Sequence, residues 1–292
     1  MKIPSNDKHR GLYDAIIVIL PYIFIVGLFQ ILAAYFSGYD YLHNKNFPPT
    51  SLQSFFSALA TVIGTTVTIL LLQKKQFDLK SFIHLGLQNL SVKKDLILGL
   101  LLGFLIMLMG FLTLLFTNEI SIQSFDFSFT ELLLNAGLFI CVAISEETLC
   151  RGYMLSNLMK SYNKYVALAI SSVLFSLLHI SNDFISILNL FDLFIAGVLL
   201  GICYIFTKRL WFAIALHFSW NFFQGTILGF NVSGNDHYSL ININYSNPTI
   251  WNGGGFGFEG SVLSIVFQVV AIYLIYDHYN HKRVTLSLAN IL

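Results

Sequence analysis

Length, composition and charge place the chain in a membrane before any motif is considered. Hydrophobic residues make up 56% of its 292 residues and charged residues 11%, against about 25% charged in ordinary soluble domains. With a mean hydropathy of +0.72, a soluble fold would lack the polar surface to cover itself, so we predict an all-α, polytopic membrane helical bundle. The net charge of +1 says nothing about partners, but no basic tract is long enough to suggest nucleic acid, and the lipid bilayer is the expected surroundings.

Eight apolar segments come close to the roughly 20 residues that a membrane-spanning helix needs. The first, at about 22 residues, is longer than the roughly 7–15 apolar residues of a signal peptide, and no convincing cleavage site follows, so we interpret it as a span. The segments run almost end to end, which favours one integral membrane domain over residues 1–292 with a motif-bearing core at about 131–277. The predicted spans are about 14–36, 53–73, 96–117, 131–152, 165–181, 184–206, 210–229 and 261–277.

Lysine and arginine lie almost entirely in alternate connections between these spans. Fourteen of the 16 stand on one side of the eight-span arrangement, in the two termini and after spans two, four and six; Lys45 stands on the other side and Arg151 within span four. By the positive-inside rule, both termini are expected in the cytoplasm. The predicted location is a cell membrane that the chain crosses several times.

Two connections are long enough to have structure of their own. The segment Lys74–Lys94 is polar with interspersed apolar residues, and we expect it to lie in the membrane interface. The stretch 230–260 is rich in Gly, Asn and Tyr and is interpreted as the only sizeable loop, with Tyr238, Tyr245 and Trp251 at headgroup level.

Glycine pairs inside two spans favour close helix packing. Gly99 with Gly103, and Gly197 with Gly201, have the Gly-x-x-x-Gly spacing that lets helix backbones approach each other. Because glycine is common in membrane helices, the spacing alone leaves an incidental occurrence open.

The residues best suited to chemistry are concentrated in the run Ser145-Glu-Glu-Thr-Leu-Cys-Arg151. Ionisable side chains in a membrane helix are expensive to hold in hydrocarbon and indicate a functional site. Residues four apart share a helix face, so Glu147 and Arg151 can form an ion pair. Glu146 is rotated by about 100° from Glu147 and is expected to point toward the bundle interior.

Two histidines and an amide complete the candidate set. His217 and Asn221 share one face of span seven, and Phe175 and His179 share one face of span five. A carboxylate can act as general base for a water molecule that a histidine also holds, while a second histidine and an amide can donate to a developing oxyanion. This division of labour predicts hydrolysis in a polar cavity open to the cytoplasmic side. His179 lies deeper in its span than Glu146 does, a mismatch that the sequence leaves open.

These motifs, in this order, resemble the pattern of the CPBP family of intramembrane proteases, also called type II CAAX prenyl endopeptidases or the Abi family. The resemblance covers about residues 131–277, and the glycine-rich run before the last span is similar to that of many bacterial members. The three motifs are Glu146-Glu147-x-x-x-Arg151, Phe175-x-x-x-His179 and His217-x-x-x-Asn221.

The resemblance implies an eight-helix intramembrane endopeptidase of bacterial origin that hydrolyses a peptide bond. Glu146 would be the general base, aided by His179, and the oxyanion role would fall to His217 and Asn221. Glu147 and Arg151 would support them. The implied partner is a peptide or protein substrate reached from the cytoplasmic side.

No cofactor is expected to be required. The chain lacks the His-Glu-x-x-His helix of zincin metalloproteases. The family has been described both as metalloproteases and as metal-independent glutamate proteases. The alternative is therefore a divalent metal such as zinc, held by Glu146, His179 and His217.

Other polar residues receive no catalytic role. Cys150 lies inside the first motif but is not expected to be a nucleophile, Glu259 is a possible loop or substrate contact, and Asp192 is left unassigned. Three histidines are expected to be solvated loop residues: His237, His278 and His281. The three cysteines are expected to be buried apolar residues and not a disulfide framework: Cys141, Cys150 and Cys203.

Two other classes of function remain open from the sequence. A bacteriocin-immunity or membrane scaffold protein of the same family would act without proteolysis. A proton-coupled carrier would also place acids and histidines within the membrane, but carriers are often built from internal repeats, and none is visible here.

Overall fold

The computed structural model describes residues 9–40, 48–72, 83–88 and 92–289. Helices make up most of the described chain, and its one sheet has only two strands, which confirms the predicted all-α fold. Its α-helices are α1 (Arg10–Ile17), α2 (Ile19–Ser37), α3 (Ser51–Leu72), α5 (Val92–Phe116), α6 (Phe129–Glu147), α7 (Ser156–Ser161), α8 (Lys164–Leu178), α9 (Ile187–Thr207), α10 (Trp211–Asn221) and α11 (Val262–Ala289). The other elements are the π-helical stretches η1 (Thr148–Leu155) and η2 (Phe222–Ile227), the 3-10 turns η3 (Gly254–Phe256) and η4 (Phe258–Gly260), and the strands β1 (Ile120–Phe125) and β2 (Ile241–Tyr245).

Several helices keep their large apolar side chains on the outside, as a membrane protein requires. On α2, Leu20 is 75% exposed and Phe24 is 74% exposed, which is favourable against lipid but not against water. The chain is therefore a multi-pass membrane protein. Six described segments are long and apolar enough to cross a bilayer: Arg10–Ser37, Ser51–Leu72, Val92–Phe116, Phe129–Ser161, Ile187–Thr207 and Val262–His281.

The predicted spans 165–181 and 210–229 are shorter than expected. Helix α8 has 15 residues, and α10 has 11 before its π-helical continuation η2. At about 1.5 Å per residue, 15 residues span less than the roughly 30 Å of a hydrocarbon core. The helix that contains the predicted span 131–152 is longer than predicted, because α6 continues through η1 and α7 to Ser161.

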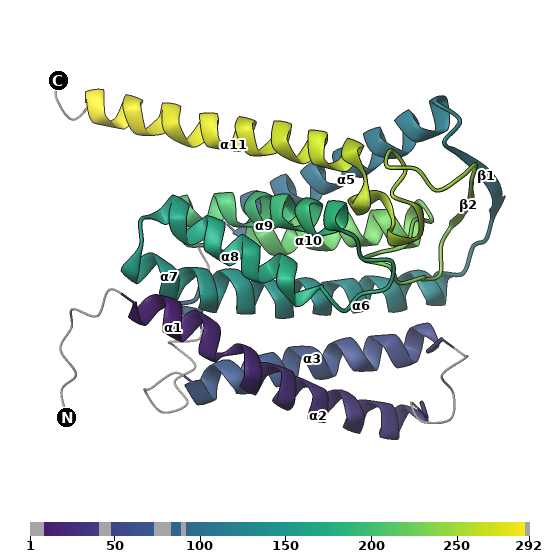
Figure 1. The fold of residues 1–292 in the computed structure, drawn as a ribbon, viewed down its shortest axis with the longest axis horizontal. Helices are drawn as coiled ribbons and strands as arrows, with labels where there is room; N and C mark the ends of the chain where they lie inside the picture. Colours follow the sequence, from purple (N-terminus) through teal and green to yellow (C-terminus); the bar gives the residue numbers. More distant parts are fainter. Residues whose placement is uncertain (1–8, 41–47, 73–82, 89–91, 290–292) are drawn as a thin grey trace.

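The continuous helix α6–η1–α7 runs through the middle of the bundle (Figure 1). Helix α3 packs between α2 and α6, α10 packs against α5 and α6, and α9 packs against α8 and α11. Helix α1 begins and α11 ends at the same end of the bundle, here called the terminal end (Figure 1). The β1–β2 sheet, the end of α2 and the start of α3 lie at the opposite end, here called the sheet end (Figure 1).

The segment 230–260 is more structured than the predicted loop. Its strand β2 pairs antiparallel with β1, which places Ile120 opposite Tyr245. Tyr245 is partly buried and packs against the ring of Phe230, and the Tyr238 hydroxyl donates to the carbonyl oxygen of Asp126 at 2.6 Å. Of the three predicted headgroup anchors, Trp251 is exposed, at 51%. The predicted interfacial segment 74–94 lies largely outside the described residues.

Both glycine pairs lie at close helix contacts, as predicted. A Cβ on Gly99 would lie 2.5 Å from the carbonyl oxygen of Phe212, and one on Gly103 would lie 2.8 Å from the Cβ of Ser219. The second pair packs in the same way against α8: Gly197 against Ser172 and Gly201 against Leu168.

We expect Gly99→Ala to destabilise the protein by about 1–3 kcal/mol, because the new methyl group meets backbone atoms that cannot move aside. The matched control is Gly27→Ala on α2, where a Cβ has no heavy atom within 4 Å. A helical Gly→Ala change without a clash is stabilising by about 0.5–1 kcal/mol. Thermal unfolding in detergent should show a lower melting midpoint for Gly99→Ala and a slightly higher one for Gly27→Ala than for the wild type. Equal midpoints for the two variants would contradict the close contact at Gly99.

Candidate active site

The structure brings the three motifs together midway along the bundle. Glu146 and Glu147 end α6, but they stand in the middle of the continuous helix Phe129–Ser161. His179 caps the C-terminus of α8, where the turn-forming run Ser181-Asn182-Asp183 follows. Because α8 stops partway and α6 continues, His179 and Glu146 meet, which resolves the depth mismatch left by the sequence.

Glu147 and Arg151 form the predicted ion pair, and it is fully buried. The Arg151 Nη1 atom donates to Glu147 Oε1 at 2.8 Å, with Arg151 1% exposed and Glu147 0% exposed. Arg151 Nη2 also donates to the carbonyl oxygen of Gly197 at 3.1 Å, and the guanidinium lies 4.4 Å from the ring centre of Phe175. A buried charge is tolerated only when it is paired and hydrogen-bonded, and these contacts meet that requirement.

Hydrogen bonds on the far side of each imidazole fix how the two rings face the site. His217 Nδ1 lies 2.8 Å from Glu147 Oε1, and His179 Nδ1 lies 2.8 Å from the carbonyl oxygen of Phe175. Both partners are acceptors, so each Nδ1 carries the proton, and the Nε2 of a neutral ring has a free lone pair.

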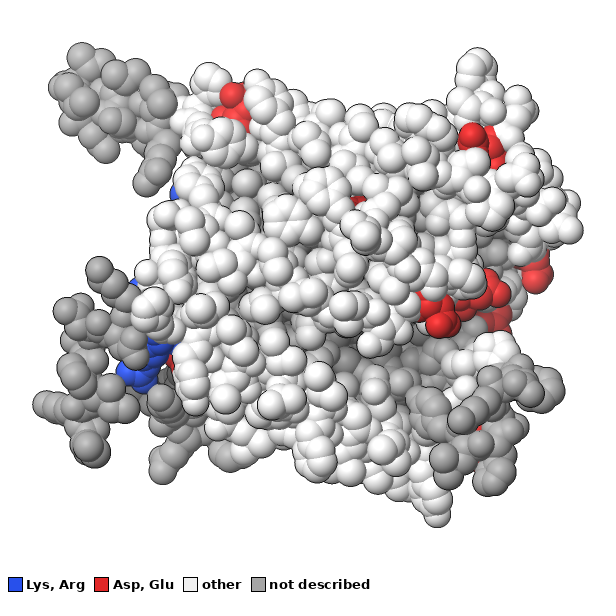
Figure 2. Space-filling model, viewed as in Figure 1, with Lys and Arg blue, Asp and Glu red and all other residues white. Residues whose placement is uncertain are grey.

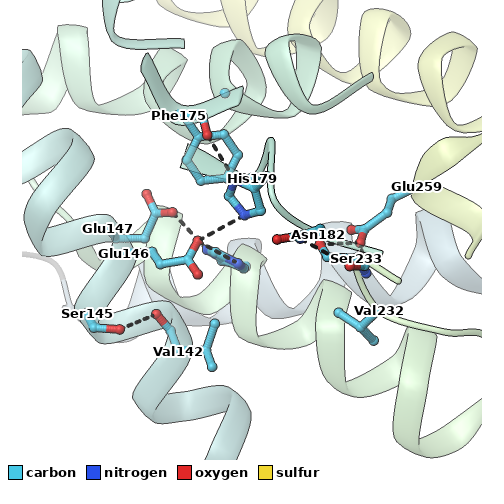
Figure 3. Close-up of polar contacts among 12 residues, drawn as sticks. Val142, Ser145, Glu146, Glu147, Phe175, His179, Asn182, Val232, Ser233 and Glu259 are labelled. Carbon is cyan, nitrogen blue, oxygen red and sulfur yellow. Dashed lines mark hydrogen bonds and ion pairs between the residues drawn. The ribbon is translucent and has the colours of Figure 1, made fainter. Parts of the chain in front are cut away.

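Both Nε2 atoms face the carboxylate of Glu146. The distances to Glu146 Oε2 are 3.8 Å from His179 Nε2 and 3.9 Å from His217 Nε2, and Figure 3 shows Glu146 pointing toward His179. Within the described chain Glu146 Oε2 has no hydrogen-bond partner. These gaps are too long for direct hydrogen bonds, but a water molecule about 2.8 Å from each atom fits between them.

The same three side chains are the donors that the zinc alternative requires. Metal-binding histidines also donate their second ring N–H to a carboxylate or carbonyl, as His179 and His217 do. However, ligands about 2.0–2.1 Å from a tetrahedral zinc lie about 3.3 Å apart, and the present separations are wider. No group of three His, Cys, Asp or Glu side chains in the described ranges has the arrangement of a metal site.

A cavity of about 600 Å³ adjoins these residues, a size typical of ligand-binding sites. Glu146, His179, His217 and Asn221 line it, together with Phe175. Asn221 is buried one helical turn beyond His217. From Glu146 the lining continues to the connection between α2 and α3 and to the loop after η2, both at the sheet end. The cavity thus extends from Glu146 toward the sheet end.

Glu259 joins the site from the connection between α10 and α11. It accepts hydrogen bonds from the backbone N–H and the hydroxyl of Ser233 and from the indole Nε1 of Trp220 at 3.3 Å, and it lines the cavity (Figure 3). Burial raises the pKa of Glu259. The sequence offered only the possibility of a loop or substrate contact. The stronger signal is an acid inside a glycine-rich, apolar run that can fold inward: Gly257 has φ +101°, and a Cβ there would lie 1.9 Å from the carbonyl oxygen of Asn231.

The three histidines expected to be solvated loop residues differ from that prediction in two ways. His237 is half-buried, packs edge-on against Phe139 and lines the cavity. Burial lowers its pKa to about 4. His278 and His281 are exposed but belong to helix α11, which continues beyond the predicted end of the last span.

Asp192 lies outside the site in a buried polar cluster. Its Oδ1 atom accepts hydrogen bonds from Ser264 and Gln268 of α11, so it links α9 to α11. All three cysteines are buried and free of disulfides, as predicted: Cys141, Cys150 and Cys203.

Fold and site together define a multi-pass membrane protein with a buried centre of carboxylates and imidazoles. Residues 128–223 match the family model described as Rce1-like, type II CAAX prenyl endopeptidase. This match confirms the family resemblance that the three motifs predict, and all three lie within the matched segment. The family is one of proteases, which supports hydrolase activity in general terms. None of the curated proteins matches the chain.

We expect Arg151→Leu to cost about 3–5 kcal/mol of stability, because it leaves the Glu147 carboxylate buried without its cation. The control is Arg10→Leu, which removes an exposed pair with 3.9 Å between Arg10 Nε and Asp14 Oδ2 and should cost less than about 1 kcal/mol. The double variant Glu147→Leu/Arg151→Leu should recover part of the loss. Denaturation in detergent gives all three values, and similar losses for Arg151→Leu and Arg10→Leu would refute the buried pair.

Proposed function

We propose that the protein is an intramembrane endopeptidase that hydrolyses a peptide bond with a water molecule activated by Glu146. The observation that supports this most directly is the convergence of three atoms on one gap. Glu146 Oε2, His179 Nε2 and His217 Nε2 stand around a space that fits a single water molecule. A carboxylate and an imidazole on one water form a general-base arrangement.

In the proposed reaction, the water bound between Glu146 and His179 attacks the carbonyl carbon of the substrate. Glu146 takes the proton from this water and later delivers it to the leaving amine. Atoms balance without any further reactant, because the two parts of water end on the new carboxylate and the new amine. His179, with Nδ1 tied to the Phe175 carbonyl oxygen, keeps the water in place.

Stabilisation of the tetrahedral oxyanion is assigned to His217 and Asn221. An oxyanion needs N–H donors, so His217 would act in its protonated form, with Nε2–H toward the substrate and Nδ1–H on Glu147. Glu146 and Glu147 together offset the positive charges of that ring and of Arg151. Glu147 and Arg151 are therefore positioning residues in this proposal and do not touch the substrate.

We also propose a bacterial cell membrane as the location, with both termini in the cytoplasm. The support is the distribution of charge along the bundle. Described basic residues at the terminal end include Arg10, Lys160, Lys208 and Arg209, and cytoplasmic connections are enriched in lysine and arginine.

Replacing the proposed base tests the function. We expect Glu146→Gln to lower the rate of peptide cleavage by at least about 100-fold, in line with the usual contribution of general-base catalysis, while the melting midpoint in detergent stays near that of the wild type. The control Glu131→Gln changes an acid in the first turn of the same helix and should leave cleavage unchanged.

The same variant separates proteolysis from an immunity or scaffold role. If Glu146→Gln abolishes cleavage but leaves a cellular phenotype of the protein intact, the protein acts without hydrolysis in the cell. If purified wild-type protein cleaves no member of a diverse peptide library, the endopeptidase proposal is wrong.

Metal dependence is a separate prediction. We expect cleavage by the purified protein to continue in the presence of a strong chelator, because the proposed water is held by protein side chains alone. Elemental mass spectrometry of the same preparation measures bound zinc directly. Loss of activity with chelator and its return with added zinc would favour the alternative set of Glu146, His179 and His217 as ligands.

A further inference from the structure

We propose that the active-site cavity opens to the face of the membrane opposite the termini. The peptide bond to be cleaved would then reach Glu146 from the extracytoplasmic side. That the molecule entering the cavity is a peptide rests on the proposed function. The route into the cavity does not depend on it. This differs from the cytoplasmic access that the sequence predicts.

The first support is the polar path from Glu146 to the sheet end. Helices α2 and α3 turn a row of small polar and amide side chains toward the cavity, and these give water a route between apolar helices. Gln30 donates to the Thr61 hydroxyl at 3.0 Å, and Gln53 donates to the carbonyl oxygen of Ser37 at 3.3 Å. The row on the cavity wall consists of Gln30, Ser37, Gln53, Ser54, Ser57 and Thr61.

The cavity then reaches connections at the sheet end. Tyr39 and Pro49, both in the α2–α3 connection, line its outer part, as do Ser233 and Asn235 after η2. Asn235 is exposed at this mouth. In Figure 3, Ser233 and Asn182 lie on the side of Glu146 away from Glu147 and Ser145.

At the terminal end the described residues pack closely around the central helix. Met154 and Leu158, which follow the motif along the central helix, are fully buried. Helix α1 packs against α7 there, with the Gly11 N–H donating to the Ser161 hydroxyl at 2.9 Å. A Cβ on Gly11 would lie 2.3 Å from the carbonyl oxygen of Asn157, so α1 and α7 leave no space between their backbones.

Charge assigns the two ends to the two faces of the membrane. In the described parts of the sheet-end connections there is no lysine or arginine, whereas Asp126, Asp183 and Asp236 are exposed there. Figure 2 shows lysine and arginine at one end of the molecule and most of the visible acidic side chains at the other. By the positive-inside rule the sheet end is extracytoplasmic, and the cavity belongs to it.

The substrate class follows from this route. It is an extended segment of an exported or membrane-anchored polypeptide, presented on the extracytoplasmic side. The sequence pointed to the cytoplasm because the predicted fourth span ended at residue 152, which put Glu146 close to the terminal end. The helix in fact continues to Ser161, so Glu146 lies midway and faces the other opening.

Cysteine accessibility tests the route without requiring catalysis. Ser57→Cys probes the cavity wall, Asn235→Cys the mouth, and Lys208→Cys the exposed terminal end. Spheroplasts that contain each full-length variant are treated with a small, negatively charged methanethiosulfonate, before and after permeabilisation. The wild type, whose cysteines are buried, sets the baseline. Melting midpoints establish which variants are folded, and Asn235→Cys alters an exposed side chain.

We expect intact spheroplasts to label Ser57→Cys and Asn235→Cys, and permeabilisation to be required for Lys208→Cys. Labelling of Ser57→Cys or Asn235→Cys only after permeabilisation, or of Ser57→Cys under neither condition, would overturn the inference. Peptide cleavage by purified protein is measured separately. Labelling from the extracytoplasmic side without peptide cleavage would support the route and contradict the endopeptidase proposal. Peptide cleavage with labelling only from the cytoplasmic side would support the endopeptidase proposal and contradict the route.

Discussion

The buried ion pair between Glu147 and Arg151 is the interaction on which the site depends. A carboxylate charge is costly to bury in a membrane, and the guanidinium offsets that cost for Glu147. The same Glu147 oxygen also accepts a hydrogen bond from His217 Nδ1. The guanidinium in turn reaches the backbone of α9 at Gly197 and the ring of Phe175 on α8. Four helical segments are thereby fixed around one charge pair, and the imidazole of His217 is oriented by it.

Two adjacent carboxylates have opposite environments because helix geometry turns neighbouring side chains apart by about 100°. Glu147 is fully buried, and its Oε1 atom accepts from both Arg151 and His217, whereas the Glu146 side chain is 27% exposed and faces the cavity. Such a difference separates a structural acid from one available for proton transfer. The two neighbouring acids can therefore serve as a structural ion-pair partner and as a proton acceptor without any large movement of the backbone.

The motifs predicted which side chains would meet, because residues four apart on a helix share a face whatever the rest of the fold does. They could not predict depth, which depends on where each helix ends: α8 stops at Leu178 while the central helix continues to Ser161. Hydropathy located the apolar segments but could not see that residues 120–125 and 241–245 form a sheet. Nor could it place Glu259, because its contacts with Trp220 and Ser233 depend on a loop folding inward over a long sequence separation.

The π-helical stretch Thr148–Leu155 directly follows the acidic pair in the central helix. A π-helix accommodates more residues per turn than an α-helix does, so its residue count sets the angular offset between the helical segments before and after it. All eight of its residues are buried. Deleting one of these residues would allow the backbone hydrogen bonds to return to α-helical spacing. The acidic pair would then rotate away from α8 and α10. Apart from Arg151, side chains in this stretch should thus be exchanged more readily than its length can be changed.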